Sequence, residues 1–303
     1  MFDELVSIVM STYNESFEEL KKSVESILNQ TYKNIEVIII NDNPENEQLN
    51  TNLQKIVSID SRIKLYKNEK NLGLVESLNR ALSYANGDYI ARMDADDISI
   101  STRIENQINY LCRKELDLIG GNILLIDEND ICFGMLKFPE LEKKIKFFMR
   151  WGSCLPHPTW FGKREIFERL QGYRTVLYCE DYDFLLRAID LGFKLGNCPE
   201  ECLKYRVRKN SISQSNNVMQ YILRNYLFSN RRTICDLDNI ILSDYLQSAE
   251  FQNECRQYSN FCAMKMIVKK NKFNIAYVFK FIINKYFWKY VEEKVALKLR
   301  GMT

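Results

Sequence analysis

Hydrophobic positions in the first third of the chain follow two alternating spacings. Short, nearly continuous apolar runs occur at residues 6–10, 35–40, 63–66 and 89–93. The segments between them carry apolar residues at helical intervals, as at Phe17, Leu20, Val24, Ile27 and Leu28. Strands that are apolar along their whole length and alternate with amphipathic helices are typical of a parallel sheet with helices on both faces. The pattern therefore predicts an α/β fold.

The rest of the chain changes character twice. Residues 104–111 continue the helical spacing, segments 118–126 and 131–138 indicate a β-hairpin, and residues 203–207 indicate a last strand. Beyond about residue 215 the pattern is helical, without a strand signal. We therefore expect one domain over residues 1–215 and a helical region over residues 216–303.

Three acids, Asp94, Asp96 and Asp97, follow the fourth apolar run. A buried strand does not tolerate clustered unpaired anions, so these acids should lie at its carboxyl end, where open α/β sheets bind ligands. Three carboxylates this close need a cation, and Mn²⁺ or Mg²⁺ suits oxygen ligands that act together with phosphates. The alternative is a polar turn in which Asp97 or Ser99 caps the next helix.

Composition narrows the class of protein. A hydrophobic share of 46% and a charged share of 27% are ordinary for a folded soluble protein. Nine scattered cysteines, an odd number, favour reduced thiols in the cytosol over a disulfide framework. No apolar run approaches the roughly 18–20 residues of a spanning helix, and the acidic opening Met1-Phe2-Asp3-Glu4 argues against a secretory signal. We therefore expect a cytoplasmic protein.

The net charge of +2 conceals a basic tail. Residues 265–300 hold ten Lys or Arg and two acids, so the rest of the chain carries a net charge of −6. Aromatic residues such as Phe287 and Trp288 lie among these bases, a mixture that fits docking on an anionic membrane surface. The acidic body argues against nucleic acid as the partner. The alternative is a helix packed on the core with a solvated lysine face, and the preceding helices could serve as packing or homodimer surface.

Several short motifs, in their order and spacing, resemble family 2 glycosyltransferases with the GT-A nucleotide-sugar fold. The resemblance runs from about residue 6 to residue 213. It is carried by Val-Ser-Ile-Val-Met-Ser-Thr-Tyr-Asn-Glu at 6–15, Gln30-Thr31-Tyr32, Asn41-Asp42, Asn71-Leu72-Gly73, the acidic cluster, His157-Pro158 and Glu180-Asp181. It implies a Rossmann-like, mainly parallel mixed sheet.

The resemblance also implies where a nucleotide binds. The loop after the first strand and the acid after the second strand take this role, and Thr12, Tyr13, Glu15 and Asp42 occupy these positions. Asp42 would accept the imide N–H of uracil, and Tyr13 would pack on the base. An Asx-turn before Pro44 is the alternative explanation of Asp42.

Within the acidic cluster, the resemblance implies Asp94 at a sugar hydroxyl and Asp96 on the metal ion. Asp97 would orient its neighbours or cap the next helix. Arg92, on the preceding strand, would screen this charge or touch phosphate, although an ion pair alone would also explain it.

Transfer to a sugar hydroxyl needs a general base, because the hydroxyl is a poor nucleophile; such a base contributes about 10²–10⁴-fold. The resemblance assigns this role to Asp181, with Glu180 as a ligand of the acceptor hydroxyl and Asp183 as a weaker candidate. Neighbouring acids would raise the proton affinity of Asp181. Alternatively, all three acids only stabilise a helix N-terminus.

Two further residues have open roles. His157 is the only histidine, and it is either a satisfied structural residue or lies near the diphosphate or acceptor. Arg208 stands where many relatives carry a histidine that completes the metal shell. Arginine cannot coordinate a cation, so Arg208 would instead bind diphosphate, and metal dependence would be weaker.

Together these observations predict an inverting glycosyltransferase at the inner face of the cell membrane. It would move a sugar from a UDP donor, with Mn²⁺ or Mg²⁺, to a lipid-linked saccharide in cell-surface polysaccharide assembly. A sugar-phosphate nucleotidyltransferase is disfavoured, because Ser11-Thr12-Tyr13-Asn14 lacks the glycines of a phosphate loop. A catalytically silent scaffold that retains the nucleotide fold is the other alternative.

Overall fold

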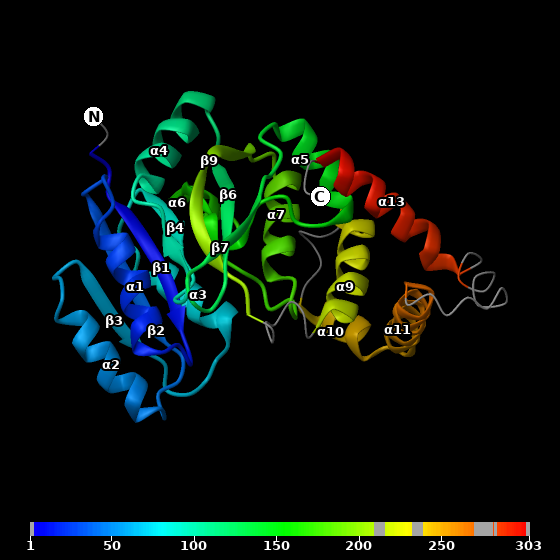
Figure 1. Cartoon of the computed structure of the whole chain (residues 1–303), viewed down its shortest axis with the longest axis horizontal. Helices are drawn as coiled ribbons and strands as arrows, with labels where there is room; N and C mark the ends of the chain where they lie inside the picture. The colour runs from blue at the N-terminus through cyan, green and yellow to red at the C-terminus, as the bar shows by residue number, and fades with distance from the viewer. Residues whose placement is uncertain (1–2, 209–215, 232–238, 270–280, 282–283, 301–303) are drawn as a thin grey trace.

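The computed structural model describes residues 3–208, 216–231, 239–269, 281 and 284–300 (Figure 1). Within these residues, strands form one sheet in the order β3-β2-β1-β4-β8-β6-β9-β5, and β7 pairs with β6. The first half of the sheet is parallel and consists of β1 (Val6–Thr12), β2 (Ile35–Asn41), β3 (Ile63–Lys67) and β4 (Tyr89–Arg92). These strands match the four apolar runs of the sequence.

Helices cover both faces of the sheet. One face is covered by α1 (Phe17–Leu28), α2 (Glu47–Val57) and α4 (Arg103–Lys114), and the other by α3 (Leu74–Tyr84), α6 (Arg164–Arg169) and α7 (Glu180–Asp190). Successive side chains of a strand point to opposite faces, so in β2 Ile38 and Ile40 enter one core while Val37 and Ile39 enter the other. Burial on both faces explains the uninterrupted apolar run, and the predicted α/β fold is confirmed.

The second half of the sheet is mixed. β8 (Phe161–Lys163) runs antiparallel to β4, β6 (Leu118–Ile126) runs antiparallel to β8, and β9 (Leu195–Arg206) runs parallel to β6. The predicted hairpin is confirmed as β6 with β7 (Cys132–Leu136), and β5 (Ile98–Ser99) pairs with β9.

Three details differ from the sequence pattern. β9 is longer than the strand expected at 203–207, and the three residues of β8 are too few to be predicted as a strand. The alternative in which Asp97 or Ser99 caps the next helix does not hold, because Thr102 occupies the N-cap of α4 and Ser99 lies in β5.

The segment between β7 and α7 contains α5 (Glu142–Phe148) and two short 3₁₀ helices, η1 (Met149–Trp151) and η2 (His157–Thr159). The helices that follow the sheet are α9 (Asn217–Ser229), α10 (Asn239–Gln247), α11 (Ala249–Lys269) and α13 (Lys285–Arg300). Figure 1 shows them gathered on the side of α7, away from β3.

These C-terminal helices share a hydrophobic core with the sheet domain. Leu223 and Leu227 of α9 belong to the same buried cluster as Leu185 of α7, and Tyr286 of α13 joins it. Tyr221 stacks on Tyr258 with ring centroids 3.9 Å apart. Residue 215, the predicted boundary, lies outside the described residues. Every helix in the described part of the chain is too short or too polar to span a bilayer.

Candidate active site

Asp94, Asp96 and Asp97 lie in the turn after β4, at the carboxyl ends of the parallel strands. One carboxylate oxygen from each lies within 4.8 Å of the other two. The side chains of Asp94 and Asp96 are 31% and 23% exposed, whereas Asp97 is buried. A partly open acidic cluster therefore follows the buried strand, as the sequence predicts.

Asp96 and Asp97 connect this cluster to the end of β9. Arg208 donates from Nε to Asp96 Oδ2 at 2.8 Å and from Nη2 to Glu19 Oε1 at 2.9 Å. The backbone N–H of Arg206 donates to Asp97 Oδ1 at 2.8 Å. Asp97 Oδ2 is buried and has no hydrogen-bond partner among the described residues. A buried oxygen in this state is costly, so it offers an open ligand position.

The electrostatics of the cluster favour a bound cation. Burial and the charge of Asp94 raise the pKa of Asp96 to about 6, and Arg208 opposes this rise. Burial and the charges of Asp94 and Asp96 raise the pKa of Asp97 well above its ordinary value. A hard divalent ion prefers carboxylate oxygens and would favour their ionised forms. The residues present, including the unpartnered oxygen of Asp97, therefore fit Mn²⁺ or Mg²⁺.

Arg92 is a buried cation that interacts with both groups of acids. It is 3% exposed, and its Nη2 lies 2.5 Å from Asp94 Oδ1. Its Nε and Nη1 are buried without a hydrogen-bond partner among the described residues. Its charge also partly offsets the effect of burial on the pKa of Glu180 and of Asp181. Arg92 therefore acts electrostatically on both the acidic cluster and α7.

The three acids at the start of α7 have different surroundings. Glu180 and Asp181 are half-buried; burial and the charge of Asp181 raise the pKa of Glu180 to about 7. Burial also raises the pKa of Asp181. Asp183 is fully buried and is paired with Arg174 and with Arg187, whose Nε donates to its Oδ2 at 2.8 Å. These two partners give Asp183 a structural role.

Asp42 is buried at the end of β2 and holds the start of α3. Its Oδ1 accepts the N–H of Leu72 at 2.8 Å, and its Oδ2 accepts that of Gly73 at 2.9 Å. The Asx-turn expected around Asp42 is made instead by Asn41, whose Oδ1 accepts the N–H of Asn43 at 2.9 Å. The Asp42 carboxylate has further lone pairs that can accept a ligand N–H.

The loop after β1 lies beside Asp42. The N–H of Asp42 donates to the carbonyl of Thr12 at 2.9 Å. Glu15 Oε2 accepts the Thr12 hydroxyl at 2.6 Å and the N–H of Tyr13 at 2.8 Å, so Glu15 shapes this loop. The side chain of Tyr13 is exposed. The structure thus brings together the four residues predicted at the nucleotide.

His157 lies on η2 in a buried aromatic cluster. Its Nε2 lies 2.9 Å from the hydroxyl of Tyr173, and its ring centroid lies 4.5 Å from that of Trp160. Burial, together with the charge of Arg92, holds the pKa of His157 well below its usual value. A neutral, hydrogen-bonded imidazole is typical of a structural histidine. This is one of the two roles that the sequence leaves open for His157.

Glu19 and Arg206 also contact the acidic cluster or its arginine, and neither was predicted as a site residue. Glu19 forms a capping box with Ser16, a spacing visible in the sequence, but its contact with Arg208 joins segments far apart in the chain. Arg206 donates from Nε to the carbonyl of Asp96 at 2.9 Å, besides its backbone bond to the cluster. Nothing in the local pattern of β9 indicates that contact.

A mainly parallel sheet with an acidic cluster and a second acidic pair matches the arrangement that the resemblance to GT-A glycosyltransferases implies. Residues 7–171 match the family described as Glycosyl transferase family 2, so the chain belongs to that family. It is 38% identical over 214 residues to the uncharacterized glycosyltransferase MJ1057 of Methanocaldococcus jannaschii, covering 69% of this chain and 74% of the relative. The family assignment bears out the resemblance seen in the sequence.

Other relatives carry more specific names. The chain is 33% identical over 217 residues to the UDP-Glc:alpha-D-GlcNAc-diphosphoundecaprenol beta-1,3-glucosyltransferase WfgD of Escherichia coli, covering 71% of this chain and 82% of WfgD. S. aureus TarS 1–349, solved with UDP-GlcNAc, has a TM-score of 0.61 at 17% identity and covers 82% of this chain and 72% of its own. The mannosyltransferase PcManGT of Pyrobaculum calidifontis, solved with GDP-Man and Mn²⁺, has a TM-score of 0.60 at 14% identity and covers 99% and 86%. These two solved structures share the fold.

Proposed function

We propose that the chain is an inverting glycosyltransferase that moves a sugar from a UDP donor to a lipid-linked saccharide in cell-surface polysaccharide assembly. One observation carries the proposal: the buried Arg92 acts on Asp94 of the acidic cluster and on Glu180 and Asp181 of α7. A metal-binding cluster and a candidate base therefore belong to one site rather than to two.

The donor nucleotide would bind across the ends of β1 and β2. Tyr13 offers an exposed ring for the base, and Asp42 offers acceptor oxygens for the imide of uracil. Thr12 and Glu15 fix the loop between them. The UDP-glucose in the name of WfgD supports a UDP donor, and the GDP-mannose bound to PcManGT makes GDP the competing nucleotide.

The diphosphate would lie at the acidic cluster. Asp96, with help from Asp94 and Asp97, would hold Mn²⁺ or Mg²⁺, which supplies Lewis-acid stabilisation of the leaving diphosphate. Arg208 lies beside Asp96 and offers a planar fork of donors for phosphate oxygens. A diphosphate at Asp96 would therefore meet both the guanidinium of Arg208 and the metal ion held by the carboxylates.

On the opposite side, Glu180 would hold the acceptor hydroxyl and Asp181 would accept its proton. The hydroxyl oxygen attacks the anomeric carbon while the bond from that carbon to the diphosphate oxygen breaks. The electron pair leaves with the nucleoside diphosphate, and the proton passes to Asp181. Attack opposite the leaving group inverts the anomeric centre. Burial raises the pKa of Asp181, and this strengthens its ionised form as a base.

Membrane docking would bring the enzyme to a lipid-linked acceptor. On α13, Trp288, Val295 and Leu299 are exposed, while Tyr286 and Ala296 are buried in the core. One face of α13 is therefore packed on the core, which agrees with one alternative from the sequence. Another face is exposed. The exposed side of α13 also carries lysines, including Lys294 and Lys298. Residues 270–280, also part of the predicted tail, lie outside the described residues.

Sugar transfer by wild type and by Asp181→Asn tests the proposal. With UDP-sugars, Mn²⁺ and a lipid-linked saccharide, we expect transfer by wild type and a loss of about 10²–10⁴-fold in kcat for Asp181→Asn. Donor affinity, followed by thermal shift, should change little, because Asp181 does not contact the nucleotide in this assignment. A wild-type protein that binds UDP without turnover would instead be a silent scaffold. Release of diphosphate from a nucleoside triphosphate and a sugar phosphate would indicate a nucleotidyltransferase.

A further inference from the structure

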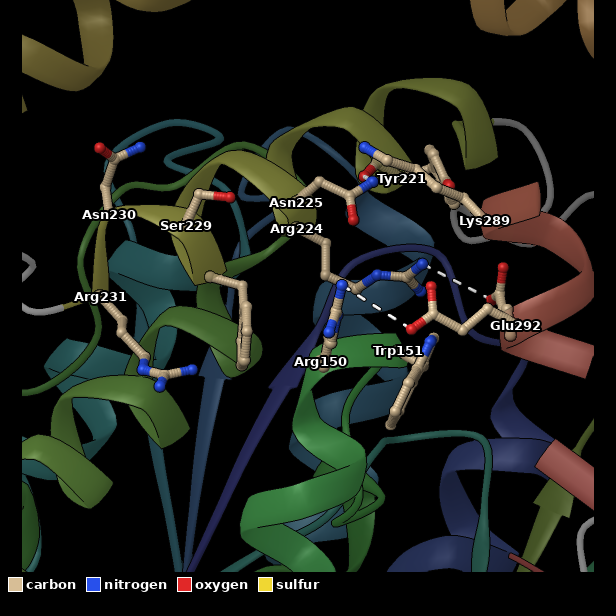
Figure 2. Close-up of a pocket in the computed structure, with 12 residues that line it drawn as sticks. Arg150, Trp151, Tyr221, Arg224, Asn225, Ser229, Asn230, Arg231, Lys289 and Glu292 are labelled. Carbon is tan, nitrogen blue, oxygen red and sulfur yellow. Dashed lines mark hydrogen bonds and ion pairs between the residues drawn. The ribbon is translucent and has the colours of Figure 1, made fainter. Parts of the chain in front are cut away.

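A cavity is enclosed by η1, α9 and α13, apart from the acidic cluster (Figure 2). Its volume of about 590 Å³ is within the range of small-molecule sites. The charged residues that line it are Arg150, Arg224, Arg231, Lys289, Glu292 and Glu293. Four bases and two acids leave the cavity with an excess of positive charge, so it favours an anion.

The three arginines of this cavity are held by aromatic rings that also line it. The pairs, with the distance from guanidinium carbon to ring centroid, are Arg150–Trp151 (5.7 Å), Arg224–Tyr221 (5.1 Å) and Arg231–Phe228 (4.4 Å). Stacking restrains a planar guanidinium while its N–H groups stay available at the edge. The cavity is therefore preorganised for a ligand with several acceptor oxygens.

The internal partners of these arginines bind them loosely. Arg150 Nη2 lies 3.7 Å from Glu292 Oε1, and Arg224 Nη2 lies 3.5 Å from Glu293 Oε1, as the dashed lines of Figure 2 show. Charge-assisted hydrogen bonds are shorter, about 2.7–2.9 Å. Arg224 Nε is buried and has no hydrogen-bond partner among the described residues. A phosphate group could therefore make bonds that the two glutamates do not.

Helix α9 joins this cavity to the first turn of α7. Gln220 Nε2 donates to the carbonyl of Tyr178 at 3.1 Å, and the hydroxyl of Tyr182 donates to the first carbonyl of η1 at 2.5 Å. Arg224 follows Gln220 by one helical turn, ~6 Å along the axis. Arg224, which lines the cavity, therefore lies one turn of α9 from the hydrogen bond to Tyr178, and Tyr178 precedes Asp181 by three residues.

We propose that this cavity binds the diphosphate of the acceptor, a saccharide joined through its reducing end to a lipid diphosphate. The saccharide would then extend from the arginines toward Asp181. This inference rests on the proposed function, because it assigns the anionic part of the same acceptor. Arginine forks match phosphate oxygens in pairs, which a lysine cannot do. Anionic lipid headgroups offer the same phosphate chemistry, so the test must separate the two sources.

Kinetics with two soluble acceptors test the inference. One acceptor is a saccharide on a short alkyl diphosphate, and the other is the same saccharide as a phosphate-free alkyl glycoside. We expect Arg150→Ala with Arg231→Ala to raise KM for the diphosphate acceptor at least tenfold and to alter KM for the glycoside less than twofold. Arg224→Lys should raise KM for the diphosphate acceptor by an intermediate factor, because charge remains and the fork is lost. Arg113→Ala, an arginine stacked on Tyr110 of α4 outside the cavity, is the matched control.

A direct binding measurement keeps the inference independent of turnover. Calorimetry with a short alkyl diphosphate, without metal or donor, should show binding to wild type that Arg150→Ala with Arg231→Ala weakens at least tenfold. Equal binding to both proteins overturns the inference, even if wild type transfers sugar and the proposed function stands. The inference also fails if these substitutions reduce co-sedimentation with phosphatidylglycerol vesicles but leave KM for the soluble diphosphate acceptor unchanged. The cavity would then be a headgroup site.

Discussion

Asp181 and Asp183 lie two positions apart at the start of α7, yet their surroundings separate them. Asp183 has two arginine partners and no exposure, whereas Asp181 is half-buried beside Glu180. The sequence alone places three acids in this turn and ranks them only by resemblance. Contacts with arginines distant in the chain supply the physical distinction.

Replacement of Asp183 tests its structural role. Asp183→Asn leaves Arg174 and Arg187 without their shared carboxylate, and Arg187 is buried. Loss of one partner of a buried pair costs roughly 3–5 kcal/mol of unfolding free energy. Urea denaturation should show this loss as a lower midpoint with an unchanged slope. Normal stability combined with lost activity would instead assign Asp183 to the chemistry.

The pH dependence of turnover tests the coupling between Glu180 and Asp181. Burial and the charge of Asp181 raise the pKa of Glu180 to about 7, and the two carboxyls titrate as a coupled pair. Activity should therefore rise as the pH increases through about 7 and the pair loses its last proton. This repulsion is mutual, so the charge of Glu180 opposes full ionisation of the pair. Glu180→Gln removes that charge, so the acidic limb of kcat/KM should move to lower pH while kcat falls. A limb that stays in place or moves to higher pH would contradict the coupling.

At the scale of elements, the segment after β9 meets α1 across the acidic cluster. Arg208 bridges Asp96 and Glu19, and Arg206 contacts Asp97 through its backbone. The spacing of hydrophobic residues predicts a strand near the end of β9 and a helix at α1, each by itself. It does not indicate which of their side chains meet. The parallel strands could be predicted because burial on both faces leaves a continuous apolar run. The three-residue β8 leaves no such run and could not.

Substitution at Arg208 tests whether this bridge competes with a metal ion. Arg208→His removes a cation from Asp96 and adds an imidazole that can coordinate, so the Mn²⁺ concentration for half-maximal activity should fall several-fold. Arg208→Gln removes the cation without adding a strong metal ligand and serves as the matched control. If both variants shift the Mn²⁺ requirement equally, Arg208 acts through its charge alone. If neither shifts it, the bridge does not compete with metal.

At the scale of the whole molecule, the C-terminal helices are both core and surface. Tyr286 is buried in the cluster that includes Leu185 of the sheet domain, while Trp288 is exposed two positions later. A composition of bases and aromatics predicts either a membrane face or a packed helix, and the structure contains a packed face beside an open one. Composition could not separate the two, because it does not record the direction in which each side chain points.

Removal of exposed apolar side chains tests membrane docking without disturbing the core. We expect Trp288→Ser with Leu299→Ser to weaken binding to anionic vesicles, measured by co-sedimentation, at least a hundredfold, because side chains of this size each contribute about 1.5–3 kcal/mol when buried and about 1.4 kcal/mol is a factor of ten. Ile59→Ser, an exposed apolar residue distant in the chain, is the control. Unchanged co-sedimentation of the double variant would exclude α13 as the docking face.

The shared core also constrains how the chain folds during synthesis. One hydrophobic cluster contains both Val9 of β1 and Ala296 of α13. Domains ordinarily fold in order as they leave the ribosome, but this cluster is complete only after the last helix has emerged. Until then, the part of the cluster that packs against Tyr286 and Ala296 of α13 has no cover. Nascent chains of this enzyme should therefore depend on chaperones until α13 has emerged.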